Sequence, residues 1–425
     1  MRFEFATAAR ILFGAGALAE AASLATGLGG RHALLLADPS TGHVLAARVH
    51  ALATDLAQAG LAVTRHDVSG EPSTDSVLAA AAVARGAGCD IVLSLGGGSV
   101  IDSGKAVAAL LTNDGNLFDY LEVIGRGRTL VHRPAPHLAI PTTAGTGAEV
   151  TRNAVLASPA HGVKVSMRSP LMLPTVAIVD PLLTHSMPPG VTASTGLDAL
   201  TQLLEAFTCN APNPLTDGFC REGMARAARS LRRAFEQGDD AAAREDMALA
   251  SLLGGLALAN ARLGAVHGFA GPLGGRLGAA HGAVCAALLP HVVAANVRAL
   301  GERAPVAACV LSIAGSTTPC VPTAARTATA SAPSATGTTT LALARYGEAA
   351  RILTGRPTAR AGEAVAWLRD LCAALAVPSL GTLGLRECDE AEILAQARAA
   401  SSMKGNPVAL SDEELTQVLR AAREG

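Results

Sequence analysis

The stretch 90-DIVLSLGGGS-99 joins an apolar run to three glycines and a serine. The apolar run predicts a buried β-strand, and the residues from about Val100 onward predict a helix. Glycines at such a junction let backbone N–H groups approach a ligand, and the helix N-terminus favours a phosphate group. The alternative is a tight turn without a ligand. Three successive glycines followed by serine favour phosphate binding.

Further strand-like runs on both sides of this turn alternate with helical runs. They are LLLAD (34–38), LAIPTTAGTG (138–147) and TVAIVDP (175–181), with helix-like stretches at 44–59 and 77–85. Strands that alternate with helices indicate a parallel sheet covered on both faces. We therefore predict an α/β domain over residues 1–185.

From about residue 186 the pattern changes to long helical segments rich in alanine, leucine and arginine. Examples are 243–263, 360–376 and 412–423. The turn Met187-Pro188-Pro189-Gly190 marks the boundary. We predict an all-helical domain over 186–425. A Thr/Ser/Ala/Pro-rich stretch at about 307–341 has no periodicity, and we interpret it as a disordered insertion.

Composition excludes several classes of protein. The chain has 425 residues, half of them apolar, so two domains are expected. A net charge of −1 and 3% aromatic residues give no basis for nucleic-acid binding. The eight cysteines form no CxxC pair, and a chain this long needs no disulfide staples. The N-terminus lacks a signal-peptide pattern, and the apolar stretch 248–261 is shorter than the ~20 residues of a membrane span. We predict a cytoplasmic protein without membrane partners.

Two glycine patterns fail as phosphate motifs. Gly14-Ala15-Gly16 lacks the third glycine of a dinucleotide fingerprint, because Ala19 stands there, and no strong strand precedes it. Five residues, not four, separate Gly98 from Gly104, and Ala106 replaces the hydroxyl that would hold magnesium in an NTPase. The spacing and the chemistry therefore exclude an NTPase or kinase.

Two other strand ends suit a dinucleotide. Asp38 stands where an acidic side chain would accept a hydrogen bond from a ribose 2′-hydroxyl, which favours NAD over NADP. An Asp after a strand is, however, more often a plain turn residue. The loop PTTAGTG (141–147) gathers hydroxyls and small residues, and it forms either the wall of a cofactor groove or a polar turn.

Asp198, His267 and His281 form a candidate metal site. Ser194-Thr195-Gly196 predicts a helix start, which puts Asp198 in a first turn, where the helix dipole alone favours an acid. The two histidines lie in similar glycine-rich, apolar surroundings, and each is followed directly by glycine. Either histidine alone would be interpreted as a core residue. Together with Asp198 they form a carboxylate and imidazole set that suits zinc or iron(II).

The motifs together resemble the iron-containing (group III) alcohol dehydrogenase family, which also includes glycerol dehydrogenases and maleylacetate reductases. The similarity covers nearly the whole chain except the stretch 307–341. The matching segments are GGGSVIDSGKA (96–106), PTTAGTGAEVT (141–151), KVSMRSPLMLPTVAIVDPLLT (164–184), STGLDALTQLLEA (194–206), VHGFAGPLGG (266–275), AAHG (279–282) and SSMKGNP (401–407).

The resemblance implies an N-terminal dinucleotide-binding α/β domain and a C-terminal all-α domain, in the dehydroquinate synthase-like fold, with the active site in the cleft. It implies that Asp38 faces the adenosine ribose and that Asp102 lies beside the cofactor. The residues implied to hold the pyrophosphate are Gly97, Gly98 and Ser99. Those implied to line the rest of the groove are Thr142, Thr143, Thr146, Lys164 and Leu182. Asp198, His267 and His281 match the metal ligands of the family's catalytic centre.

Two positions depart from the family pattern. Many members carry a histidine four residues after the aspartate, on the same helix face, where this chain has Gln202. The amide oxygen of Gln202 is a candidate fourth ligand, although it is a poorer donor than imidazole. The glycerol dehydrogenases look like a precedent for three protein ligands, one Asp and two His, that hold zinc. Many members also place a histidine near the substrate where this chain has Gly271.

The resemblance implies an NAD(P)-dependent alcohol dehydrogenase that uses a divalent metal, Fe²⁺ or Zn²⁺, and interconverts a small alcohol and its aldehyde or ketone by hydride transfer. Two alternatives stay open. One is a maleylacetate-reductase-like carbonyl reductase that works without metal. The other is a catalytically inactive nucleotide-binding homologue. A homodimer is expected.

Overall fold

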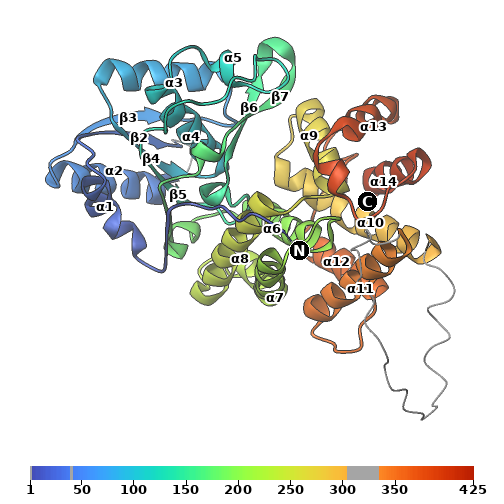
Figure 1. The fold of residues 1–425 in the computed structure, drawn as a ribbon. Coiled ribbons are helices and arrows are strands. Elements are labelled where there is room, and N and C mark those ends of the chain that lie inside the picture. The colour runs from blue at the N-terminus through green and yellow to red at the C-terminus, as the bar shows by residue number, and fades with distance from the viewer. Residues whose placement is uncertain (1, 39–41, 304–334) are drawn as a thin grey trace, which may run out of the picture.

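The computed structural model describes residues 2–38, 42–303 and 335–425, in which an α/β half is followed by a helical half (Figure 1). The elements of the α/β half are β1 (Arg10–Phe13), α1 (Ala21–Gly27), β2 (His32–Ala37), α2 (Gly42–Gln58), β3 (Ala62–Asp67), α3 (Thr74–Ala87), β4 (Ile91–Gly96), α4 (Gly98–Thr112), α5 (Leu117–Tyr120), β5 (His137–Pro141), β6 (Asn153–Ser158), β7 (Val163–Arg168) and β8 (Val176–Val179). The helices of the second half are α6 (Pro189–Thr208), α7 (Pro214–Glu236), α8 (Ala241–Asn260), α9 (Ala265–Leu277), α10 (His281–Arg303), α11 (Ala335–Thr354), α12 (Ala361–Ala374), α13 (Glu390–Ala399) and α14 (Asp412–Glu424).

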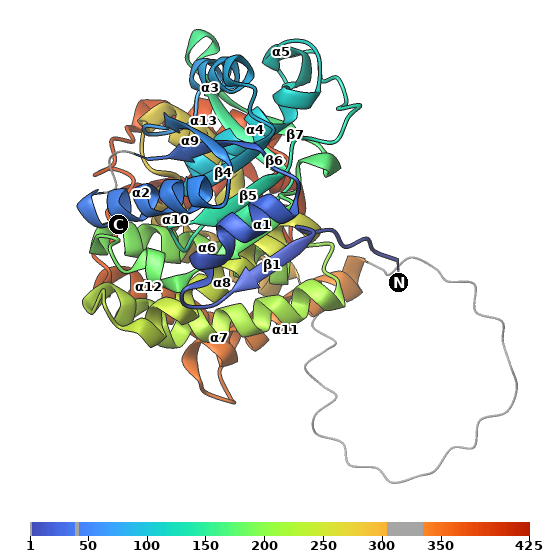
Figure 2. The same cartoon turned by 90° about the vertical axis from the view of Figure 1, so that its left-hand side faces the viewer.

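The main sheet of the described chain has six parallel strands in the order β1-β8-β5-β4-β2-β3. The central strands β2 and β4 are almost wholly apolar and pair in register, with Leu35 opposite Leu93. Such strands are buried on both faces. One face packs with α1 and α2, and the other with α3 and α4. Figure 2, which looks onto the α/β half, shows α1 and α2 at the front. The α/β fold class predicted from the sequence is confirmed.

The chain reverses its direction across the sheet between β2 and β4. From β2 it passes through α2 to the edge strand β3, whereas from β4 it passes through α4 to β5 on the opposite side. Ligands of open α/β sheets bind outside the carboxyl ends of the strands at such a reversal. Asp38 follows β2 directly, and the glycine turn 96–99 follows β4. The topology therefore brings these two predicted cofactor positions to one crevice.

The structure contains strands that the sequence did not reveal. β1 precedes Gly14 and pairs with β8, contrary to the expectation that no strong strand lies there. Its outer edge position and its four residues explain the weak signal, since a short edge strand carries little buried apolar sequence. β6 and β7 form a separate antiparallel hairpin beside α4.

The second half is helical throughout its described residues, as predicted, and the change from sheet to helix falls between β8 and α6. Most of the predicted insertion, 307–334, lies outside the described residues. For residues 335–341 the prediction of disorder is wrong, because helix α11 begins at Ala335 and includes them. Helix formers such as Leu341 and Ala342 continue into the long apolar face of α11, so the boundary was set too late.

Helix α10 is long and apolar enough to cross a membrane, and the bent pair α8 and α9 passes the same test only if taken as one span. The apolar stretch 248–261 singled out in the sequence lies almost wholly in α8 and not in α10. In the structure 72% of the apolar window of α10 is buried against other helices. It is the central helix of the second half, in contact with α6, α9, α12 and α14.

The two halves touch through small residues. A Cβ atom added to Gly147, in the loop after β5, would lie 2.4 Å from the Cα atom of Gly255 in α8. The N-terminal segment also crosses to α8, where Asn260 bonds both backbone atoms of Ala6. These contacts hold the α/β half against α8, which packs on α6, the helix that carries Asp198.

Candidate metal and cofactor site

One face of α6 carries the polar residues of the candidate site. Asp198, Gln202 and Glu205 are spaced by four and three residues, so they line one side of the helix, and all three are buried. The helix begins at Pro189, with proline in its first turn. Asp198 is therefore in the middle of α6 and not in a first turn as expected, and the helix dipole does not explain its presence.

His267 and His281 approach Asp198 from two other helices. His267 is the third residue of α9, and its Nε2 atom lies 3.5 Å from Oδ1 of Asp198. His281 is the first residue of α10, and its Nε2 atom lies 3.7 Å from the same oxygen. The two rings are 5.5 Å apart between centroids. The structure thus brings together the three predicted ligands.

The glycine that follows each histidine has a packing role. A Cβ atom on Gly282 would lie 2.5 Å from the backbone oxygen of Ser194 in α6. A Cβ atom on Gly268 would lie 3.0 Å from the side chain of Met403, in the segment 401–407 that follows α13. Glycine at 282 therefore lets α10 start close to α6, and glycine at 268 lets α9 pack against the segment around Met403.

Glu205 fixes the orientation of His267, and the sequence analysis missed it. One carboxylate oxygen of Glu205 accepts a hydrogen bond from the backbone N–H of Val266 at 2.7 Å. The other lies 2.7 Å from Nδ1 of His267. A carboxylate on one ring nitrogen leaves the other to face a metal, as in carboxylate–histidine–zinc arrangements. The seven-residue spacing from Asp198, two helical turns, was the signal for it.

The electrostatics of the cluster favour charged partners in a buried place. Burial alone would raise the pKa of Asp198, but the nearby His281 and His267 lower it overall. Burial lowers the pKa of His267, yet the neighbouring carboxylates of Asp198 and Glu205 raise it to about 10. Desolvation lowers the pKa of His281, whose side chain is still 40% exposed. A cation held here would replace the proton that His267 otherwise carries.

Three buried polar atoms of the cluster have no hydrogen-bond partner among the described residues. They are Oδ1 of Asp198, Oε1 of Gln202 and Nε2 of His267. Buried polar atoms are nearly always paired, so the unpaired Oδ1 of Asp198 and Nε2 of His267, 3.5 Å apart, need an explanation. Ligands about 2.0–2.3 Å from a tetrahedral ion lie roughly 3.3–3.8 Å from one another. The observed separations of 3.5 and 3.7 Å therefore fit a divalent cation.

Gln202 and Cys285 complete the surroundings of Asp198. Nε2 of Gln202 donates to Oδ2 of Asp198 at 3.3 Å, so its amide holds the carboxylate. The thiol of Cys285, one turn after His281 in α10, belongs to the same cluster of potential ligand atoms, which all lie within 4.8 Å of one another. Cys285 was missed by the sequence analysis, although its spacing of four residues from His281 on a predicted helix was visible.

The glycine turn after β4 lies against the threonine loop after β5. No side chain caps the first turn of α4, which leaves its N-terminus available to an anion. A Cβ atom on Gly98 would lie 2.9 Å from Oγ1 of Thr146, and one on Gly97 would lie 3.4 Å from Thr143. The N–H group of Thr142 donates to the oxygen of Gly96 at 3.0 Å. The turn that includes Ser99 and this loop form one continuous surface.

The threonine loop also reaches the metal candidates. A Cβ atom on Gly145 would lie 2.7 Å from the side chain of Thr195, which precedes Asp198 by one helical turn. Lys164 in β7 pairs with Glu71 at 2.7 Å and lies near Gly274 of α9. The predicted cofactor positions therefore extend from the crevice at Asp38 toward the helices that carry the ligands.

Two of the predicted cofactor residues have other contacts. The carboxylate of Asp102 accepts hydrogen bonds from Nζ of the buried Lys105 and from the N–H group of Val155 in β6, both at 2.9 Å. These bonds tie α4 to the β6–β7 hairpin. Leu182 lies in the turn after β8 with its side chain 40% exposed. A role for either residue in cofactor binding stays a prediction.

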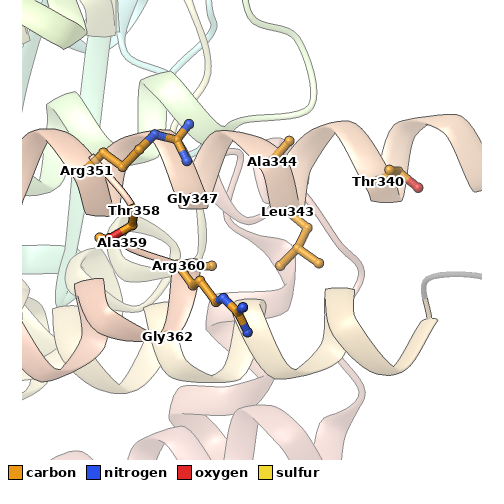
Figure 3. Close-up of a pocket in the computed structure, with 10 residues that line it drawn as sticks. Thr340, Leu343, Ala344, Gly347, Arg351, Thr358, Ala359, Arg360 and Gly362 are labelled. Carbon is orange, nitrogen blue, oxygen red and sulfur yellow. The ribbon is translucent and has the colours of Figure 1, made fainter. Parts of the chain in front are cut away.

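A surface pocket of about 580 Å³ lies elsewhere, between α11 and α12 (Figure 3). Its walls include Leu343, Gly347, Arg351 and Arg360. It shares no residue with the cluster around Asp198 or with the glycine turn after β4. The chemistry-bearing residues of the chain therefore do not point to this pocket as a catalytic site.

Comparison with known proteins matches both halves of the chain to one family. The model of the iron-containing alcohol dehydrogenase family matches residues 8–181, and that of its C-terminal domain matches residues 192–423. Among curated relatives, a long-chain-alcohol dehydrogenase of Geobacillus thermodenitrificans is 41% identical over 292 residues, which cover 67% of this chain and 73% of the relative.

Solved structures agree with this assignment. A 1,3-propanediol oxidoreductase is 31% identical with a TM-score of 0.83, and the match covers 99% of this chain and 100% of that one. A sulfoacetaldehyde reductase from Bifidobacterium kashiwanohense, solved in complex with NAD⁺, is 27% identical with a TM-score of 0.81, covering 99% of this chain and 98% of that one. The shared fold over nearly the whole length confirms the predicted combination of an α/β half and a helical half. The chain belongs to the iron-containing alcohol dehydrogenase family.

Proposed function

We propose that this oxidoreductase is an NAD(P)-dependent, divalent-metal-assisted alcohol dehydrogenase that interconverts a small alcohol and its aldehyde or ketone. One observation carries the proposal: His267 and His281, from two different helices, place their Nε2 atoms 3.5 and 3.7 Å from Oδ1 of the buried Asp198 on a third helix. Two of these atoms have no hydrogen-bond partner among the described residues. The relatives named as alcohol, propanediol and aldehyde-converting enzymes are consistent with such a site.

In this proposal Asp198, His267 and His281 hold the ion, and Glu205 orients His267 through Nδ1. When bound, a divalent ion supplies Lewis acidity, which lowers the pKa of an alcohol hydroxyl and polarises a carbonyl group. The turn 97–99 and the threonine loop position the dinucleotide, with NAD favoured because Asp38 follows β2. Position 271 carries no side chain, so the alcohol proton leaves through water or the cofactor ribose.

The test removes one ligand at a time. Asp198→Ala and His267→Ala are each expected to lose the bound metal and to lower turnover at least about 100-fold. This loss is larger than that expected when a side chain that only hydrogen-bonds a metal ligand is removed. Asp370→Ala is the matched control, because this exposed aspartate only pairs with Arg232 on the surface. Metal content by elemental analysis and turnover with an alcohol and aldehyde panel in both cofactors are measured together.

The outcome separates the alternatives. Turnover that survives chelation and either ligand substitution would overturn the metal-assisted proposal in favour of a metal-independent carbonyl reductase. Cofactor binding without turnover on any substrate of the panel would indicate an inactive homologue. We also propose that the protein is cytoplasmic. We further propose that it forms a homodimer, and light scattering of the purified chain tests this oligomeric state.

A further inference from the structure

The thiol of Cys285 lies in the candidate metal site. Cys285 is fully buried on α10 and faces the same side of that helix as His281, one turn earlier. Its Sγ atom is 3.6 Å from Nε2 of His281. Sγ and the ligand atoms of Asp198, His267 and His281 all lie within 4.8 Å of one another. Within the described residues this is a set of four potential ligands from three helices.

Gln202 is the other candidate for a fourth ligand, and its contacts assign it a different task. Its Nε2 atom donates to Oδ2 of Asp198, which orients the carboxylate so that Oδ1 faces the two imidazoles. An amide oxygen is also a weaker donor to a borderline-soft ion than a thiolate is. Gln202 therefore serves as a partner that positions Asp198, and the fourth coordination position is open to Cys285.

The separations fit four ligands around one ion. A thiolate sulfur about 2.3 Å and an imidazole nitrogen about 2.0–2.1 Å from a tetrahedral ion lie roughly 3.5–3.6 Å apart. The observed separation of Cys285 Sγ and His281 Nε2 is 3.6 Å. The unpaired Oδ1 of Asp198 and Nε2 of His267 belong to the same group.

We propose that Cys285 binds the metal as a fourth protein ligand and that its thiolate makes the site selective for zinc over iron(II). This inference uses the metal site of the proposed function and specifies its donors. Thiolate is a soft ligand, and zinc also lies above iron(II) in the order of intrinsic affinities. On binding, a bond forms between the ion and Sγ while the thiol proton passes to solvent. A fourth protein ligand does not exclude substrate, because catalytic zinc sites can expand to five ligands.

The first test uses Co²⁺ as a spectroscopic substitute for the native ion in the full chain. A cobalt–thiolate bond gives a charge-transfer absorption in the near ultraviolet that oxygen and nitrogen ligands do not give. We expect this band in the unmodified protein and in Gln202→Ala, and its loss in Cys285→Ser. Cys220→Ser is the matched control, because Cys220 is equally buried but lies in α7 outside the cluster.

The unmodified protein alone can overturn the proposal. If cobalt binds at one equivalent and no thiolate band appears, Cys285 is not a ligand, whether or not the Cys285→Ser protein folds. A band that persists in Cys285→Ser would assign the thiolate to another cysteine and would overturn it equally. Failure of the proposed function looks different, because in that case Asp198→Ala would leave turnover unchanged.

The second test measures selectivity. Metal-free protein is equilibrated without oxygen with equal concentrations of Zn²⁺ and Fe²⁺, and the bound metals are measured after gel filtration. We expect zinc to exceed iron at least tenfold in the unmodified protein and in Cys220→Ser. The ratio in Cys285→Ser should fall several-fold toward iron. An unchanged ratio would show that the thiol does not contribute to the choice of metal.

Discussion

The two halves of the molecule build their parts of the site from different material. The α/β half offers backbone: the N-terminus of α4 and the glycine turn before it, with little side-chain volume. The helical half offers side chains: Asp198, His267 and His281 come from three helices. The buried carboxylate of Glu205 orients His267. A backbone surface is damaged by adding atoms to it. A cluster of buried donors is damaged by changing the chemistry of one member.

After the three ligands themselves, the largest effect is expected at the carboxylate that orients His267. Glu205→Gln can keep an oxygen acceptor for the N–H group of Val266, but its NH2 group, a donor, then replaces the carboxylate oxygen that faces Nδ1 of His267. Loss of such outer partners costs roughly 10–100-fold in metal affinity. Competition with a chromophoric chelator measures that affinity, and Glu413→Gln, an exposed change on α14, is the control. Equal affinity in Glu205→Gln and the control would remove Glu205 from the site.

The next effect tests the backbone surface by adding one methyl group. In Gly98→Ala the new Cβ atom would lie 2.9 Å from Oγ1 of Thr146, so the turn or the threonine loop must shift. We expect the KM for the dinucleotide to rise about tenfold, equivalent to about 1.4 kcal/mol, with a smaller change in kcat. Gly86→Ala is the control, since this exposed glycine in the last turn of α3 lies outside the turn 97–99 and a Cβ atom there would meet nothing within 4 Å. Equal KM values for the two variants would show that this turn does not bind the cofactor.

The same contrast explains what the sequence predicted and what it did not. The turn 96–99 is local, so strand, glycines and helix start are visible in one short stretch. Asp198, His267 and His281 are separated by up to 83 residues (198 to 281), and their meeting point depends on how α9 and α10 pack on α6. The matched contexts of the two histidines and the family resemblance suggested the set. Glu205 and Cys285 have only a helical spacing from Asp198 and His281, and their roles depend on contacts that form when the helices pack.

Errors in the expected local structure have a related cause. Asp198 was assigned to a first turn because Ser194 and Thr195 are common at helix starts, but their hydroxyls instead bond the backbone oxygen of Val191 inside α6. β1 was missed because a four-residue edge strand is specified by its pairing with β8 and not by its own sequence. In both places tertiary packing overrides a weak local preference.

A smaller effect is expected at His137, a buried histidine of the α/β half whose pKa is lowered, whereas that of His267 in the helical half is raised. His137 in β5 is buried next to Ser94, and burial, followed by repulsion from Lys105, lowers its pKa to about 3 from an ordinary 6.5. The unfolded chain therefore binds more protons than the folded one between these values, so this group stabilises the fold above pH 6.5 and loses that contribution as the pH falls. From pH 7 to 5.5 the loss is about 1 kcal/mol in the free energy of unfolding.

Urea unfolding of the unmodified protein and His137→Gln at both pH values measures this contribution. Glu149, whose burial raises its pKa to about 7, gives a slope of opposite sign in the same interval. The difference between the two proteins therefore decides, since Glu149 is common to both. We expect the unmodified protein to lose about 1 kcal/mol more than the variant on acidification. If both proteins lose the same free energy of unfolding, the pKa of His137 is not lowered in the folded chain.

The smallest effect tests an open position beside the metal cluster. Gly271 lies one turn after His267 in α9, and a Cβ atom there would meet nothing within 4 Å. Alanine in place of glycine inside a helix contributes about 0.5–1 kcal/mol to stability. Gly275→Ala, one turn further along the same helix and equally open, is expected to give the same gain. Thermal and urea unfolding measure both variants. If the space at Gly271 receives substrate, only Gly271→Ala should also change the KM for the alcohol, with metal content unchanged in both. A matching KM in the two variants would place the bound substrate away from position 271.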